Sequence, residues 1–139
     1  MRNAARCAAV LSLLGMVVGC GGNGARSAQA PVIRVTVQDF RIKAPKRVPA
    51  GEVVFLVQNK GPDAHEFIVV RSDQRLPLRK DDVTADEDAF EKLTVGVLEP
   101  GAPGSVRKLR VRLERGHYEL LCNMSGHYLG GMRTEIEVA

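Results

Sequence analysis

The sequence predicts an all-β fold, a Greek-key sandwich or barrel of about seven short strands with one short helical excursion. The first observation is composition. Valine and glycine are frequent, aromatic residues make up only 4 % and tryptophan is absent, which favours strands and turns over helices. The second is pattern: short apolar runs recur along the chain, and clusters of glycine, proline and asparagine separate them.

The predicted strands begin at residue 32. Apolar and polar residues alternate over 33–37, which indicates a half-buried first strand, and Phe40 and Ile42 continue the pattern after an irregularity near Asp39. Residues 52–59 are apolar at both odd and even positions, which predicts a central strand covered on both faces. The remaining strands are expected at 65–70, 94–98, 106–113, 117–122 and 133–138.

Residues 71–93 interrupt this pattern with a basic stretch followed by an acidic one. Thr84 and Glu87 have the spacing of a capping box. Acidic residues occupy the first turn of the expected helix, where the helix dipole favours negative charge. We therefore expect a short helix from about residue 85 to 93, with Phe90 and Leu93 facing inward. The residue order of a calcium-binding loop is missing, so a solvated excursion is expected rather than a calcium site.

The first 19 residues have the form of a signal peptide, in which Arg2 and Arg6 precede an apolar run too short to span a bilayer comfortably. The run ends in Val17-Val18-Gly19-Cys20, which resembles the lipobox of bacterial lipoproteins. That resemblance implies cleavage before Cys20 and a diacylglycerol on its thiol, and several acyl chains would hold the protein stably at a membrane.

The chain is accordingly divided into a signal peptide at 1–19, a lipidated cysteine with a tether at 20–31, and one β domain at 32–139. The tether, GGNGARSAQAP over 21–31, is predicted to be a flexible coil of about 18 Å r.m.s. span. We expect an exported, lipid-anchored protein that faces the periplasm or the cell exterior.

Charge and cysteine counts exclude some classes of protein. Without Arg2 and Arg6, 18 basic residues stand against 16 acidic ones, which gives no support to nucleic-acid binding. The three cysteines, Cys7, Cys20 and Cys122, each have a separate predicted fate, so no structural disulfide is expected in the mature chain.

A C-x4-H-x4-M pattern near the C-terminus brings Cys122, His127 and Met132 onto one short loop. Cysteine and methionine favour soft metals such as Cu(I), and imidazole suits copper in either oxidation state. Two histidines, one cysteine and a weak axial methionine are the ligands of blue-copper sites. The loop supplies three of these four, and the fourth would be His65 or His117.

Strand parity distinguishes these two histidines. Cys122 shares its parity with the large apolar residues of its strand, so we expect it to face the core. His65 and Met132 also share parity with apolar residues of their strands, whereas the parity of His117 opposes that of Cys122. A lone buried cysteine is usually a small hydrophobic residue, but the shared parity and fixed spacing together favour a metal site.

Over residues 32–138 the chain resembles a small cupredoxin, with a ligand-loop spacing similar to that of rusticyanin-like and sulfocyanin-like members. The segments that carry the resemblance are GEVVFLVQNKG, HEF, the PG turn before Val106, and RGHYELLCNMSGHYLGGM. The resemblance implies one-electron transfer between redox proteins, and no enzymatic activity is expected. It also implies one copper ion with three equatorial ligands and an axial one: His65, Cys122, His127 and, axially, Met132.

Two positions depart from the cupredoxin pattern. Glu66 follows the first histidine, where many members have asparagine or serine that helps to join the two ligand loops. Ser125 stands where many have proline. Groups around a metal site orient its ligands, so these positions leave the tuning of the metal open.

The edge of His127 is expected to reach the surface through Gly126, Leu129 and Gly130, a small apolar patch that suits a brief encounter with a redox protein. The expected partner is a c-type cytochrome, an oxidase or a reductase, and the protein is expected to be a monomer.

Three alternatives to electron transfer remain. A copper carrier or buffer would use the same ligands, although carriers often have open sites rich in methionine and histidine and the mature chain has only Met124 and Met132. A nitrite reductase or multicopper oxidase fragment would need further copper sites made of histidine, and the chain has three histidines in all. A metal-free adhesion sandwich would leave the ligand pattern unexplained.

Overall fold

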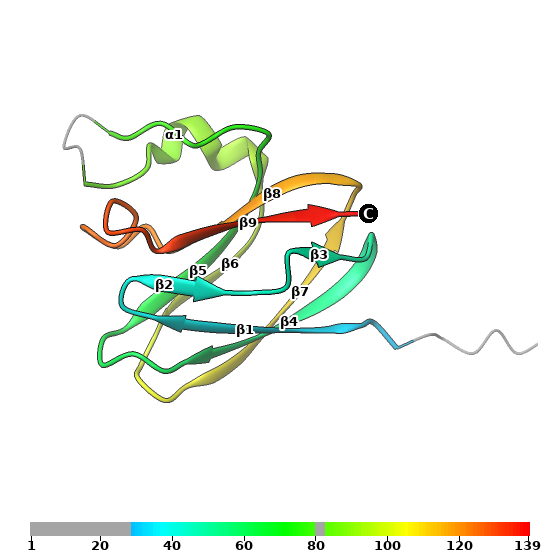
Figure 1. The fold of residues 1–139 in the computed structure, drawn as a ribbon, viewed down its shortest axis with the longest axis horizontal. Coiled ribbons are helices and arrows are strands. Elements are labelled where there is room, and N and C mark those ends of the chain that lie inside the picture. Colours follow the sequence, from blue (N-terminus) through cyan, green and yellow to red (C-terminus); the bar gives the residue numbers. More distant parts are fainter. Residues whose placement is uncertain (1–28, 80–82) are drawn as a thin grey trace, which may run out of the picture.

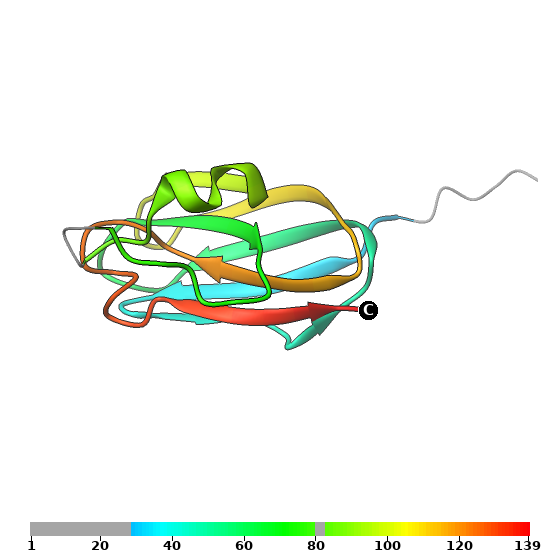
Figure 2. The same ribbon diagram turned by 90° about the horizontal axis from the view of Figure 1, so that it is seen from above.

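The computed structural model describes residues 29–79 and 83–139, which form two β-sheets packed face to face (Figures 1 and 2). One sheet has four strands in the order β2-β1-β4-β7, and the other has five in the order β3-β9-β8-β5-β6. The predicted fold class is confirmed. The helical segments of the described chain are too short to cross a membrane.

The four-stranded sheet is built around β1, which runs parallel to β4 and antiparallel to β2. β4 also pairs antiparallel with β7, in a register that sets Phe55 opposite Leu109. The strands are β1 (Val32–Gln38), β2 (Arg41–Lys43), β4 (Gly51–Asn59) and β7 (Val106–Leu113).

In the five-stranded sheet β3 is parallel to β9, and the other pairs are antiparallel. Its strands are β3 (Arg47–Val48), β5 (His65–Arg71), β6 (Thr94–Gly101), β8 (Gly116–Leu121) and β9 (Arg133–Val138). β2 and β3 are the strands beyond the predicted seven. With only three and two residues, they are too short for alternation to show them as separate strands.

The main core fills the space between the sheets. Phe55 of β4 and Phe67 of β5 are both fully buried, and their rings meet edge to face with centroids 5.5 Å apart. Cys122 and Met132 belong to the same buried cluster. The site residues therefore rest directly on the core that joins the two sheets.

The outer face of β4 differs from the prediction, because no second layer covers it among the described elements (Figure 2). Val54 is nevertheless only 8 % exposed and Leu56 is half-buried. Arg34 and Lys108 are the cross-strand partners of Leu56 on either side. The methylene stems of such long cationic side chains can cover apolar neighbours, so apolar residues appear at both parities without a second layer.

The excursion contains α1 (Glu87–Phe90) and a 3-10 turn (Glu91–Leu93), so the helix is shorter than predicted. Its N-cap is Asp86, whose side chain accepts from the backbone of Asp88, and not the predicted Thr84. Leu93 is 44 % exposed rather than buried, because the chain enters the edge strand β6 at the next residue.

Phe90 faces inward as predicted and joins a second apolar cluster on the outer side of the five-stranded sheet. The other buried members are Ile68, Val70, Leu76, Ala85, Leu121 and Tyr128. Figure 2 shows the excursion lying over this sheet. The segment expected to be solvated thus covers a second small core.

Candidate metal centre

The residues of the C-x4-H-x4-M pattern and His65 lie at one end of the sandwich, where the loop between β8 and β9 is drawn in orange and red (Figure 1). His65 is the first residue of β5, and Cys122 follows the last residue of β8. Because β5 and β8 are antiparallel neighbours, the start of one lies beside the end of the other.

Three donor atoms from these residues converge. Nδ1 of His65 lies 3.3 Å from Nδ1 of His127, and Sγ of Cys122 lies 3.5 Å from the same His127 nitrogen. All three donors lie within 4.8 Å of one another. Two donor atoms that bind the same ion at about 2.0–2.3 Å, with a trigonal angle at the ion, lie about 3.5–3.8 Å apart. The distances between these donors therefore fit the binding of one ion.

The site is buried on most sides. His65, Cys122 and Met132 have no exposed surface, and His127 is partly exposed. Burial raises the pKa of the Cys122 thiol to about 11, so in the metal-free protein it is a thiol at neutral pH. A bound cation would favour the thiolate, which makes metal binding and release of the thiol proton one coupled event.

Backbone hydrogen bonds close the ligand loop into a compact unit. The amide of Cys122 donates to the carbonyl of Met132 at 3.1 Å, and the amide of Met132 donates to the carbonyl of His127 at 2.9 Å. Gly126 has a φ of +79°, a left-handed conformation that glycine adopts at little cost. The three residues of the motif are thus held to one another through the main chain.

Glu66 is the residue after His65 whose effect on the metal site the sequence left open. Its carboxylate accepts a hydrogen bond from the backbone amide of Asn123, so the residue after His65 is joined to the residue after Cys122. Burial raises the pKa of Glu66, and this hydrogen bond opposes the rise. The longer acidic side chain joins the two ligand segments directly.

Asn123 ties the ligand loop to the excursion, a role that the spacing of the motif did not reveal. Its side-chain oxygen accepts from the amide of Ala85 at 2.6 Å. Its side-chain nitrogen donates to the carbonyl of Ala85 and to the carboxylate of Glu87, both at 3.1 Å. A second tie runs from the hydroxyl of Tyr128 to the carbonyl of Leu76, at 3.4 Å.

Asp39 lies directly behind His65 and was also missed from the sequence. Its carboxylate oxygen is 2.6 Å from Nε2 of His65, and both atoms are buried. Burial lowers the pKa of His65, and the charge of Asp39 opposes this shift. Since Nδ1 faces the other donors, Nε2 is the nitrogen that carries the proton toward the carboxylate. The irregularity near Asp39 was the only sequence signal.

Phe40 adds an aromatic ring to the surface around His127. The two ring centroids are 5.2 Å apart in an edge-to-face arrangement, and Phe40 is 49 % exposed. Leu129 is 50 % exposed, and a Cβ on Gly130 would lie 3.0 Å from the Phe40 ring. We call Phe40, Gly126, Leu129 and Gly130 the apolar patch.

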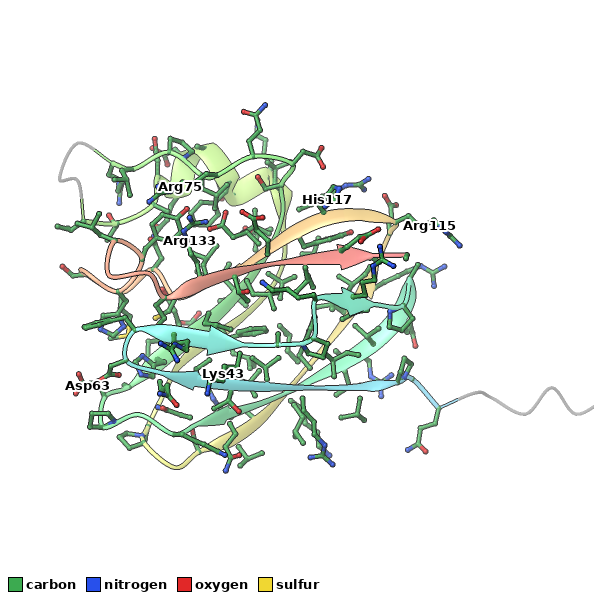
Figure 3. All side chains as sticks on the ribbon, in the orientation of Figure 1. Lys43, Asp63, Arg75, Arg115, His117 and Arg133 are labelled. Atoms are coloured by element: carbon green, nitrogen blue, oxygen red, sulfur yellow. The ribbon has the colours of Figure 1, made fainter. Side chains whose placement is uncertain are left out.

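His117 takes no part in the centre. It is exposed on β8, paired with Glu137 of β9, as its parity predicted. Figure 3 shows it toward the end of the sandwich away from the ligand loop.

The sequence matches no protein-family model and no curated protein at a significant level. Solved structures of cupredoxins do match the fold. The fold is cupredoxin-like. Auracyanin from Roseiflexus castenholzii has a TM-score of 0.60 at 17 % identity, over 79 % of this chain and 98 % of its own.

Two further cupredoxins give similar values. Auracyanin A of Chloroflexus aurantiacus, described as a "blue" copper protein, has a TM-score of 0.58 at 15 % identity, covering 80 % of this chain and 100 % of its own. Rusticyanin from Thiobacillus ferrooxidans has a TM-score of 0.59 at 14 % identity, covering 80 % of this chain and 79 % of its own. Such identities establish the fold, and together with the converging His and Cys donors they suggest a site for one copper ion.

We predict that Gly61→Ala disturbs the site from behind. The new Cβ would lie 2.8 Å from Nε2 of His65 and 2.9 Å from Oδ1 of Asp39, in a turn that the Asn59 side chain holds in place. Such overpacking costs about 1–3 kcal/mol of unfolding free energy. Denaturant unfolding of the metal-free protein, together with copper titration, would show lower stability and weaker binding.

Gly104→Ala is the matched control. Gly104 has a φ of +76°, and its Cβ would meet open space, so stability should fall while copper binding stays unchanged. Unchanged copper binding in Gly61→Ala would contradict the prediction.

Proposed function

We propose that this protein is a type 1 copper protein that carries single electrons between redox proteins and is held at a membrane by a lipid on Cys20. The observation that carries the copper assignment is the convergence of the His65, His127 and Cys122 donors within 4.8 Å inside a cupredoxin-like fold. Met132, fully buried in the same cluster as Cys122, is the proposed axial ligand.

The donor set favours copper over zinc. Structural and catalytic zinc sites use cysteine, histidine and carboxylate ligands, whereas a methionine thioether beside a thiolate and two imidazoles is typical of blue-copper sites. When bound, copper supplies a one-electron couple between Cu(I) and Cu(II).

In the proposed electron transfer, the protein holds the donor atoms in fixed positions and provides one route for the electron to the surface. The backbone bonds of the ligand loop, the Glu66 link and the Asn123 ties fix the donors from three sides. His127 is the proposed exit, because its ring reaches both the buried donors and the apolar patch.

Burial favours an electron carrier over the alternative, a copper carrier or buffer that delivers the metal. Exchange of metal requires ligands that another protein can reach, but His65, Cys122 and Met132 are fully covered. We also propose that the protein is not an enzyme, since the donor set is typical of electron-transfer sites and three of its four residues are fully buried.

A small, partly aromatic patch supports a short-lived complex with a c-type cytochrome, an oxidase or a reductase, formed by a monomeric carrier. Cys20 lies outside the described residues. β1 begins at the end of the domain away from the ligand loop (Figure 1), so an anchor upstream of β1 would leave the apolar patch free. The proposed location is a membrane facing the periplasm or the cell exterior.

The copper assignment predicts an intense visible thiolate-to-copper band when Cu(II) is added to the domain. Ascorbate should bleach the band reversibly, and Cys122→Ser should abolish it because the thiolate is lost. His117→Ala serves as the control and should keep the full band, since His117 is remote from the cluster. A pale spectrum that Cys122→Ser leaves unchanged would refute the type 1 site.

We predict that Leu129→Glu slows electron exchange with a c-type cytochrome about tenfold, because a charge in the apolar patch would have to be desolvated or repelled on docking. The visible spectrum should not change, since Leu129 is exposed and supplies no ligand. Stopped-flow mixing measures the rate. Val97→Glu makes the same charge change at a site that is 42 % exposed on β6, and equal slowing there would contradict the exit at His127.

Lipidation predicts that the expressed full chain takes up a palmitate analogue and fractionates with membranes. Cys20→Ser should lose the label because the acceptor thiol is gone, while Cys7→Ser should keep it. Persistent labelling of Cys20→Ser would rule out this anchor.

A further inference from the structure

The outer face of the four-stranded sheet carries a concentration of positive charge that the near-neutral composition conceals. Seven basic residues and one acidic residue, all exposed, project from this face and its adjoining turn. They are Arg34, Arg41, Lys43, Lys60, Lys108, Arg110, Arg112 and the acid Glu52. We call this set the basic face. The other described residues carry nine basic and thirteen acidic side chains, so the charges are segregated.

Strand register places the members of the basic face side by side. Arg34, Leu56 and Lys108 form one row across β1, β4 and β7, and Arg110 stands opposite Val54 in the next row. The intervening residues of each strand point into the core. The cations therefore form a continuous surface rather than scattered points.

Little in the described chain neutralises this surface. Arg110 forms an ion pair with Glu52 at 3.6 Å, and both side chains are more than half exposed. None of the other six cations has an ion-pair partner among the residues that the structure describes. The face would gain most from a partner that brings many negative charges in one plane.

The basic face has a shallow groove and is partly apolar. A groove of about 340 Å³ runs between Arg34, Leu56, Lys60 and Val106. Val32 and Val106 are 54 % and 56 % exposed on the same face. Cations bordering exposed valines match a lipid surface, where phosphate groups lie just above glycerol and acyl carbons.

The chain also enters the domain on this sheet. The carbonyl of Pro31 accepts from the amide of Val54 at 2.9 Å, which fixes the end of the tether against the middle strand. The predicted tether spans about 18 Å r.m.s., so a lipid on Cys20 would keep the face close to the bilayer. A short connection raises the local concentration of the lipid surface next to the basic face.

We propose that the basic face docks on anionic phospholipid headgroups, so that the sandwich lies on its four-stranded sheet. The ligand loop is then at one end of the domain, and the excursion lies on the layer farther from the bilayer (Figure 2). The tether argument rests on the proposed anchor at Cys20, whereas the electrostatic docking requires neither the lipid on Cys20 nor copper.

The experiment uses residues 29–139, which contain both sheets and both apolar clusters. The protein is sedimented with vesicles of phosphatidylcholine alone or mixed equally with phosphatidylglycerol, at low and high salt. We expect binding only to the mixed vesicles, with strong weakening by salt because exposed charges are screened.

Two matched variants separate the face from net charge. Arg34→Glu, Lys108→Glu and Arg112→Glu combined should weaken binding at least about a hundredfold, because three attractions become repulsions. Arg79→Glu, Lys92→Glu and Arg115→Glu make the same change in net charge elsewhere and should weaken it much less. If the glutamate variant of the basic face unfolds, glutamine at the same three positions replaces it. Glutamine keeps much of the side-chain stem and should give an intermediate loss of vesicle binding.

Three results would overturn the proposal: no binding of the unaltered protein, equal weakening in the two glutamate variants, or tighter binding to duplex DNA than to mixed vesicles. Thermal unfolding checks that each variant is folded. The copper spectrum of the face variant should be unchanged, so a failure of docking and a failure of the copper site give different readings.

Discussion

The antiparallel pairing of β5 with β8 is the constraint on which the rest of the site depends. It brings the first residue of one strand, His65, next to Cys122 at the end of the other, although 56 residues separate them in the sequence. The same alignment lets Glu66 reach the amide of Asn123. A ladder of backbone hydrogen bonds sets this alignment, so the fold itself fixes which donors lie side by side.

Support for the ligand loop comes from both sides of the five-stranded sheet. On the inner side, Cys122 and Met132 pack into the core between the sheets. On the outer side, Tyr128 belongs to the second cluster with Phe90, and Asn123 bonds to Ala85. The excursion thus supports the loop through its apolar residues, through the backbone of Ala85 and through the carboxylate of Glu87.

Features encoded by local alternation could be predicted from the sequence. The inward direction of His65, Cys122 and Met132 follows from strand parity, as does the exposure of His117. Asp39 and Phe40 could not be found in this way, because their contacts with His65 and His127 depend on how the β1–β2 connection packs against the opposite sheet. Leu93 was misplaced because its direction depends on where the helix stops and β6 begins, and boundaries are weakly encoded.

The buried contact between Asp39 and His65 would affect the reduction potential of the proposed copper centre. A negative carboxylate behind a ligand stabilises a doubly charged ion more than a singly charged one, and the effect is strengthened where water is largely excluded. In the proposed copper centre, the oxidised form would therefore be favoured relative to a site in which a neutral carbonyl accepts from the same nitrogen. In the proposed copper protein, this contact would therefore lower the reduction potential of the bound ion.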